Sequence, residues 1–138
     1  MKELSLWRWL SHAQVRLGKD LHLCRVENGD CSPGFPDVEG CYKGTQFFLE
    51  LKVKTVPVRE RTPIRPKFQK SQPNWHRKRL TAGGRSFILF QLDRKTRLLF
   101  PSQLIPQLQA GMNKAQLLEA SLVPVGARQE EIIHAAIQ

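Results

Sequence analysis

The sequence predicts an α/β fold in which a helix, a three-stranded antiparallel meander, a second helix and a parallel strand precede a short helical tail. Apolar residues recur with helix or strand spacing in that order between residues 3 and 92. A strand that follows a strand and a helix favours a right-handed parallel crossover. The chain has 138 residues, 41% of them hydrophobic, which is enough for one core and too little for two. We expect one domain, with a core over about residues 3–100 and a tail over about residues 101–138.

The first helix is expected over residues 3–17, because apolar residues recur there at helical spacing and Gly18 follows: Leu6, Leu10, Ala13 and Leu17. Residues 21–27 (LHLCRVE) then predict a strand that ends at the turn residues 28–30 (NGD).

A β-hairpin is predicted over residues 35–54 (FPDVEGCYKGTQFFLELKVK), with its turn at Lys43-Gly44. In the second strand, residues 47, 49, 51 and 53 point to one face and residues 48, 50, 52 and 54 to the other. A strand with so few polar positions is usually covered on both faces, so Glu50 and Lys52 are expected in a largely buried environment. The alternative is a cross-strand ion pair or a solvated edge.

Asp37 opens the first strand of this hairpin, and pairing across the turn brings it to the same end of the sheet as Glu50. Two carboxylates that close repel each other unless a hard cation neutralises them. Mg²⁺ fits this site because it prefers oxygen ligands and is often held by one or two carboxylates; Mn²⁺ should substitute for it. Lys52 would then orient a water molecule or stabilise developing negative charge.

Pro36-Asp37, followed by Glu50-Leu51-Lys52, resembles the signature of the PD-(D/E)xK nucleases, and the flanking residues resemble its VRR-NUC and Holliday-junction-resolvase-like branch, often met in phage genomes. The resemblance covers about residues 3–92 and implies a restriction-endonuclease-like core. It also implies hydrolysis that leaves a 5′-phosphate, with the Leu51 carbonyl joining the two acids at the metal.

Related nucleases often supply a third metal-binding acid from the first helix, and Glu3 matches it by position. The alternative for Glu3 is a first-turn acid favoured by the helix dipole. Glu27 is the rival third acid, although an ion pair with Arg25 would explain it without a metal. Glu39 is interpreted as peripheral.

The second long helix is predicted over residues 72–82, with Pro73 in its first turn. Its Gln72-x-x-Trp75 is similar to a motif of the VRR-NUC branch, which implies that Gln72 approaches the active site and orients the water or Lys52. An ordinary helix cap is the alternative for Gln72. His76 is interpreted as a surface histidine.

A central strand is expected over residues 86–92 (SFILFQL), with a hairpin partner at residues 97–100. Short helices are expected at residues 102–109, 113–120 and 127–137, where no chemistry is visible.

A formal charge of +10 indicates an anionic partner, and DNA is the partner we expect. Three prolines exclude a continuous helix or central strand over residues 54–71. The basic residues of this loop and of the following helix are predicted to bind the phosphate backbone: Lys54, Arg59, Arg61, Arg65, Lys67, Lys70, Arg77 and Lys78. The alternative is a loop that only keeps the protein in solution.

We therefore expect a Mg²⁺-dependent endonuclease that acts on DNA. The preference for branched or junction DNA rests on the resemblance alone. The resemblance also allows a homodimer. The alternatives are a non-catalytic basic module that binds nucleic acid, or a restriction-type or RNA-directed nuclease on the same fold. Three cysteines without a CxxC motif favour a reduced intracellular compartment, and no apolar stretch reaches the roughly 20 residues of a membrane span, so we expect a cytoplasmic protein without a membrane partner. The resemblance implies a bacterium or a phage-infected host.

Overall fold

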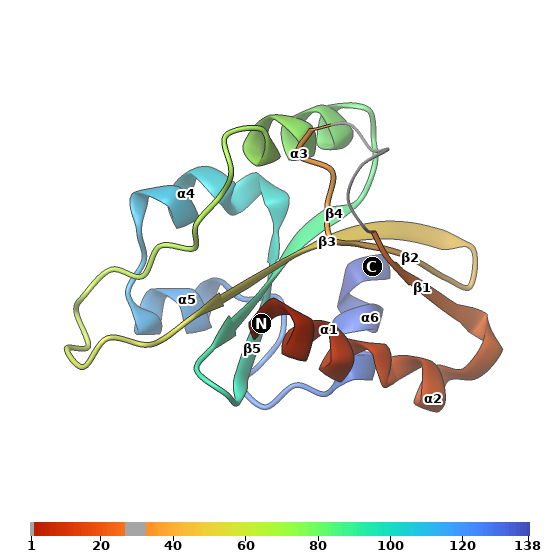
Figure 1. Ribbon diagram of the computed structural model, residues 1–138, viewed down its shortest axis with the longest axis horizontal. Coiled ribbons are helices and arrows are strands. Elements are labelled where there is room, and N and C mark those ends of the chain that lie inside the picture. Colours follow the sequence, from red (N-terminus) through yellow and green to blue (C-terminus); the bar gives the residue numbers. More distant parts are fainter. Residues whose placement is uncertain (1, 27–32) are drawn as a thin grey trace.

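A five-stranded mixed sheet forms the centre of the fold in a computed structural model that describes residues 2–26 and 33–138 (Figure 1). The strand order follows the chain. Strands β1 to β3 form an antiparallel meander, β3 and β4 are parallel, and β5 returns antiparallel to β4. This topology confirms the predicted meander, crossover and final hairpin. The strands are β1 (Leu21–Arg25), β2 (Val38–Tyr42), β3 (Thr45–Lys54), β4 (Ser86–Leu92) and β5 (Thr96–Pro101).

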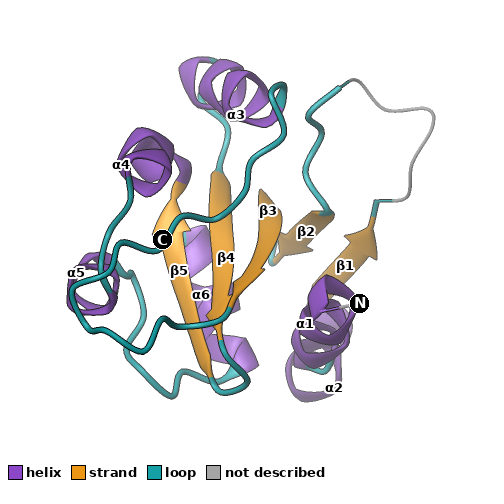
Figure 2. Ribbon diagram, turned by 60° about the vertical axis from the view of Figure 1, so that its left-hand side comes forward, coloured by secondary structure: helices purple, strands orange, loops and turns teal. Residues whose placement is uncertain are grey.

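Helices cover both faces of the sheet (Figure 2). One apolar core joins the sheet to α1 (Lys2–Ser11), α2 (Ala13–Leu17) and α6 (Gln129–Ile137). A second core, on the opposite face, joins it to α4 (Ile105–Ala110) and α5 (Lys114–Ala120). Helix α3 (Gln72–Thr81) lies at the end of the sheet where β4 begins. None of the helices among the described residues is long and apolar enough to cross a bilayer.

The first helix is broken at His12, although the sequence predicted one helix over residues 3–17. The Ser11 hydroxyl donates to the Arg8 carbonyl at 2.8 Å, and the His12 N–H bonds instead to the Trp9 carbonyl. A serine that competes for a backbone acceptor in this way bends or interrupts a helix. The short 3-10 segment η1 (Gly18–Asp20) follows α2 and leads into β1.

The hairpin register places the acidic residues. Tyr42 pairs with Thr45, so the turn consists of Lys43 and Gly44, whose φ angles of 49° and 87° are both positive. Two-residue turns of this kind match the twist of antiparallel strands. Counting back from the turn, Val38 pairs with Leu49, so Asp37 stands just beyond the last paired residue, next to Glu50.

Three of the predicted boundaries differ in the structure. Strand β1 ends at Arg25 rather than residue 27, after which the Val26 N–H donates to the Asp37 carbonyl at 2.8 Å. Glu27, the predicted turn at residues 28–30 and Cys31 lie outside the described residues. In the tail, the expected helix over residues 102–109 divides into the 3-10 segment η2 (Ser102–Leu104) and α4. Helix α5 is confirmed and is capped by Asn113, and α6 begins two residues later than predicted.

Candidate active site

Asp37 and Glu50 lie next to each other at the entrance to β2, where each carboxyl group perturbs the pKa of the other. The Leu51 N–H donates to Asp37 Oδ2 at 2.8 Å, which holds the Asp37 side chain against β3. Glu50 is 1% exposed, whereas Asp37 is half-buried and forms the open side of the pair. The structure therefore brings together the two acids that the sequence singled out, and it excludes a solvated edge for Glu50.

Burial sets the protonation of this pair. Burial first and the neighbouring Glu50 charge second raise the pKa of Asp37 from 3.8 to about 7, against the opposing effects of the Leu51 N–H and Lys52. Burial also raises the pKa of Glu50 to about 7, with the charge of Glu3 acting in the same direction. Two carboxyl groups this close cannot both be ionised cheaply, so near neutral pH the pair holds about one proton between them.

Lys52 lies on the same face of β3 as Glu50 and is 7% exposed. Its Nζ donates to Gln72 Oε1 at 2.9 Å and to the Lys67 carbonyl, and it lies 4.8 Å from the centre of the Phe68 ring. Gln72 Nε2 in turn donates to Glu50 Oε2 at 2.8 Å. One amide at the start of α3 therefore joins the lysine to the glutamate, as expected for a glutamine that approaches the site.

Gln72 Oε1 also accepts from the Gln69 N–H at 2.8 Å, just before α3 begins. The N-cap of α3 is Ser71, and Gln72 makes no bond to the backbone N–H groups of its own helix, all of whose residues the structure describes. The same oxygen therefore closes the preceding turn and holds Lys52 but is not a helix cap.

An aromatic cluster fixes α3 against the sheet. The rings of Phe35, Phe48 and Trp75 meet edge to face with centroids 5.2–5.7 Å apart, and the Arg79 guanidinium lies 4.7 Å from the centres of the Phe48 and Trp75 rings. Gly34, at φ +84°, allows this close approach, since a Cβ there would collide with the Ser71 carbonyl. Because α3 is held in this position, its first turns face Glu50 of β3.

His76 is buried, and its interpretation as a surface histidine was wrong. It lies four residues after Gln72, so both side chains lie on the face of α3 that packs on the sheet. Its Nε2 is 3.4 Å from Glu50 Oε1. Burial lowers the pKa of His76 to about 4, so the ring is neutral at pH 7 and the contact is a hydrogen bond rather than an ion pair. The four-residue spacing from Gln72 was the signal that could have identified it.

The donor set fits Mg²⁺ or Mn²⁺ in its chemistry. Asp37 and Glu50 offer carboxyl oxygens whose pKa values are raised mainly by burial, so a bound cation would favour their ionised forms. Mg²⁺ takes one or two carboxylates and keeps several water molecules, so two protein acids are sufficient. Within residues 2–26 and 33–138, no group of three His, Cys, Asp or Glu side chains could hold a metal.

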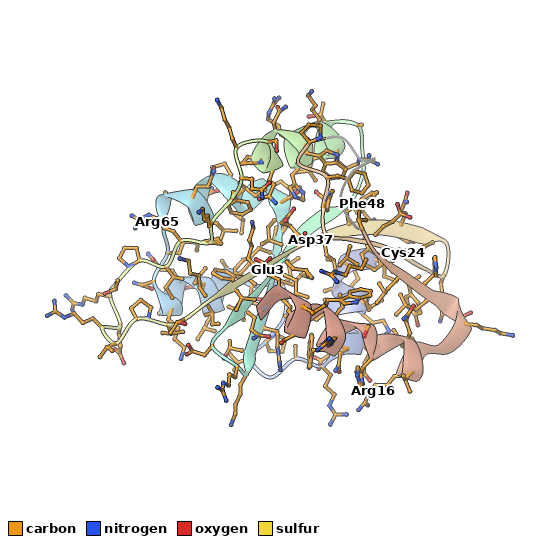
Figure 3. All side chains as sticks on the ribbon, in the orientation of Figure 1. Glu3, Arg16, Cys24, Asp37, Phe48 and Arg65 are labelled. Carbon is orange, nitrogen blue, oxygen red and sulfur yellow. The ribbon has the colours of Figure 1, made fainter. Side chains whose placement is uncertain are left out.

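Glu3 lies exposed at the start of α1, in the same central region as Asp37 (Figure 3). It does not form a three-acid group with Asp37 and Glu50, although its charge acts on Glu50. Its role as a third metal acid stays a prediction. The rival, Glu27, lies outside the described residues.

All eight basic residues predicted to bind DNA are exposed, but they lie at different distances from the acids. The loop after β3 projects from the sheet and turns back near Arg59, whose carbonyl accepts from the Thr62 N–H (Figure 1). Arg59 and Arg61 therefore lie at the tip, away from α3. The returning segment packs its backbone against the site: the Lys67 carbonyl accepts from Lys52, and the Gln69 N–H donates to Gln72. The side chains of Lys67 and Lys70, in this same segment, are exposed.

No protein-family model matches the chain, and no curated protein matches it. Among solved structures, the chain is similar to Hjc, a Holliday junction resolvase from the archaeal hyperthermophile Archaeoglobus fulgidus. The TM-score is 0.53 at 18% sequence identity, over 80% of this chain and 90% of Hjc. This likeness and the strand order confirm the predicted α/β, restriction-endonuclease-like fold.

Proposed function

We propose that this protein is a divalent-metal-dependent endonuclease that hydrolyses phosphodiester bonds in DNA, with Mg²⁺ as its natural ion. The observation that carries the proposal is the buried carboxyl pair of Asp37 and Glu50, with Lys52 on the same face of β3. Burying two acids side by side costs stability, and such perturbed groups concentrate at functional sites. An ion bound between them would offset that cost.

Each residue has a separate task in this proposal. Asp37 and Glu50 are the metal ligands, joined by the Leu51 carbonyl, and Glu3 supplies a further negative charge nearby. A bound divalent cation would polarise a phosphate oxygen and lower the pKa of a water molecule. Lys52 positions the attacking water or stabilises the negative charge that develops on the phosphate, because its ammonium group is held in place by Gln72 and the Lys67 carbonyl. Hydrolysis in this way leaves a 5′-phosphate.

Branched DNA is the proposed substrate. Two observations support this choice: the likeness in fold to a Holliday junction resolvase, and the Gln72-x-x-Trp75 motif. On the strength of that motif we propose that the chain belongs to the phage-type VRR-NUC and resolvase-like branch. The segment that packs on Lys52 and Gln72 and the helix that follows it carry exposed cations, which would contact the backbone phosphates: Lys67, Lys70, Arg77 and Lys78. Symmetrical cleavage of a junction would require a homodimer.

The proposal is tested with a four-way junction, a flap, a single strand and a linear duplex, each incubated with Mg²⁺, with Mn²⁺ or with EDTA. We expect cleavage of the branched DNAs with either metal and none in EDTA, and no cleavage by Glu50→Gln under any condition. Tight binding of all four DNAs without cleavage in either metal would replace the nuclease by a non-catalytic binding module.

A further inference from the structure

Four buried polar side chains form a continuous hydrogen-bonded row beneath α3. His76 Nε2 is 3.4 Å from Glu50 Oε1, His76 Nδ1 is 3.0 Å from Ser86 Oγ, and Ser86 Oγ is 2.6 Å from Ser102 Oγ. The exposed fraction of each of the four residues is 4% or less. The row links β3, α3, β4 and η2, and the roles proposed for Asp37, Glu50, Lys52 and Gln72 do not explain it.

Only one arrangement of protons satisfies the whole row when Glu50 is ionised. A carboxylate only accepts, so the neutral His76 ring must carry its proton on Nε2 and donate it to Glu50. Nδ1 then accepts, and the donor is the Ser86 hydroxyl. Ser86 Oγ accepts in turn from the Ser102 hydroxyl. Each group thereby fixes the orientation of the next, and the row points its donors toward Glu50.

The two oxygens of Glu50 are held from different directions. Gln72 Nε2 donates to Oε2 at 2.8 Å, and His76 approaches Oε1. A glutamate has three rotatable bonds, and one hydrogen bond leaves its carboxyl plane free to turn. Two donors on separate oxygens define that plane next to Asp37.

We propose that His76 is a positioning residue that, backed by Ser86 and Ser102, holds the Glu50 carboxylate in the orientation that binds the metal ion beside Asp37. This inference rests on the proposed nuclease function and adds to it a residue that the PD-(D/E)xK signature does not contain. Mg²⁺ demands near-ideal geometry of its ligands, and partners that orient a ligand are typically worth about 10- to 100-fold in metal affinity.

The row also gives the segment after β5 a part in the site. Ser102 opens η2, and η2 packs against α3 and β4. The Ser102 hydroxyl therefore fixes the same row from the side opposite to Glu50. In this way the beginning of the C-terminal tail supports the metal site without touching it.

The test compares His76→Leu with His76→Gln by titrating Mn²⁺ alone into each protein in a calorimeter, without DNA. Leucine fills the buried space but donates no hydrogen bond, whereas the glutamine amide carries an N–H close to the position of Nε2. We expect about a 10- to 100-fold weaker Mn²⁺ affinity for His76→Leu and a loss of only a few-fold for His76→Gln. Ser86→Ala should fall between them.

Ser121→Ala is the matched control, because Ser121 is a partly buried serine whose hydroxyl bonds to the backbone of Leu99, outside this row. We expect it to lower thermal stability without changing Mn²⁺ affinity. Equal Mn²⁺ affinity in wild type and His76→Leu, or equal losses in His76→Leu and His76→Gln, would overturn the inference.

A second measurement uses the unmodified protein and therefore does not depend on how the variants fold. Nitrogen-15 NMR of the metal-free protein should show the His76 proton on Nε2 and an unprotonated Nδ1. A proton on Nδ1 would overturn the positioning role while leaving the nuclease proposal intact. A wild-type protein that binds no Mn²⁺ and cuts no DNA would overturn both.

Discussion

Asp37 Oδ2 accepts a hydrogen bond from the Leu51 N–H at 2.8 Å, one residue beyond Glu50, whose charge raises the pKa of Asp37. The backbone of β3 thus holds the side chain of the strand before it. Because the hairpin register and this bond fix Asp37 relative to Glu50, the two acids are positioned before any ion arrives. A site organised in advance does not have to reorganise when it binds its ligand or stabilises charge.

The acids are tested first by removing one charge at a time. Asp37→Asn and Glu50→Gln keep the shape of the side chains but weaken metal binding, so each should lower DNA cleavage by several powers of ten. Glu119→Gln, an exposed acid on α5, is the control and should cut like the wild type. Cleavage rates on a labelled four-way junction measure the effect, with circular dichroism to verify folding. Unchanged rates in both variants would place the active site elsewhere.

Lys52→Met should abolish cleavage while Mn²⁺ affinity stays within a few-fold of the wild type, because Lys52 is proposed to act on the water or phosphate and not to bind the ion. Gln72→Leu releases both Lys52 and Glu50, so it should lower both the cleavage rate and the metal affinity. Calorimetry with Mn²⁺ and single-turnover cleavage separate the two effects. Parallel losses of affinity and rate in Lys52→Met would contradict this division of roles.

Metal-free stability should depend on pH through the acid pair. Both folded pKa values are raised to about 7, from 3.8 for Asp37 and 4.5 for Glu50. A group with a raised pKa gives its full stability below the unfolded value and loses it as the pH rises through the folded value. The wild type in EDTA should therefore lose stability between about pH 4 and pH 8.

Asp37→Asn has no proton to lose at this site, so it should become more stable than the wild type by roughly 1–3 kcal/mol at pH 8.5, with the gain disappearing toward pH 5. Urea unfolding at several pH values, with EDTA present, measures the difference. A gap between the two proteins that does not change with pH would show that the pair is not protonated as described.

Lys67 and Lys70, whose segment packs against Lys52 and Gln72, should contribute more to DNA binding than the arginines at the tip of the loop. In an Asp37→Asn background, which prevents cleavage, Lys67→Gln with Lys70→Gln should weaken binding and reduce the slope of log affinity against log salt by about 2. The Lys67 carbonyl that holds Lys52 is unaffected by this change. Fluorescence anisotropy at several salt concentrations gives the slope.

Arg59→Gln with Arg61→Gln should have a smaller effect, since both residues lie at the tip of the loop. Lys19→Gln, an exposed lysine in η1, is the control and should leave the slope unchanged. If the Lys19 variant lowers the slope as much as the Lys67 and Lys70 variant, the binding is a general effect of the net charge.

The hairpin could be predicted from the sequence because its evidence is local. Alternating side chains set the faces of β3, and the Lys43-Gly44 turn fixes the register, so the meeting of Asp37 and Glu50 follows from counting along the chain. The parallel pairing of β3 and β4 followed from the intervening helix in the same way.

The row that ends at Glu50 could not be predicted as a whole. His76 stands within a run of basic residues whose composition indicates a surface, and only its spacing from Gln72 opposes that. Ser86 and Ser102 come from separate strand ends, and their contact depends on how β5 returns along β4, which no local pattern encodes. The break at His12 was missed for another reason: it depends on one serine hydroxyl that competes for a backbone carbonyl.

Diffraction from crystals soaked in Mn²⁺ shows whether Asp37 and Glu50 hold the metal ion, because the anomalous signal of manganese locates the ion without assumptions about the protein. We expect an anomalous peak about 2.0–2.3 Å from carboxyl oxygens of both Asp37 and Glu50, and its loss in Glu50→Gln crystals. A protein that cleaves DNA with Mn²⁺ but shows its only anomalous peak away from these two side chains would prove that they are not the metal ligands.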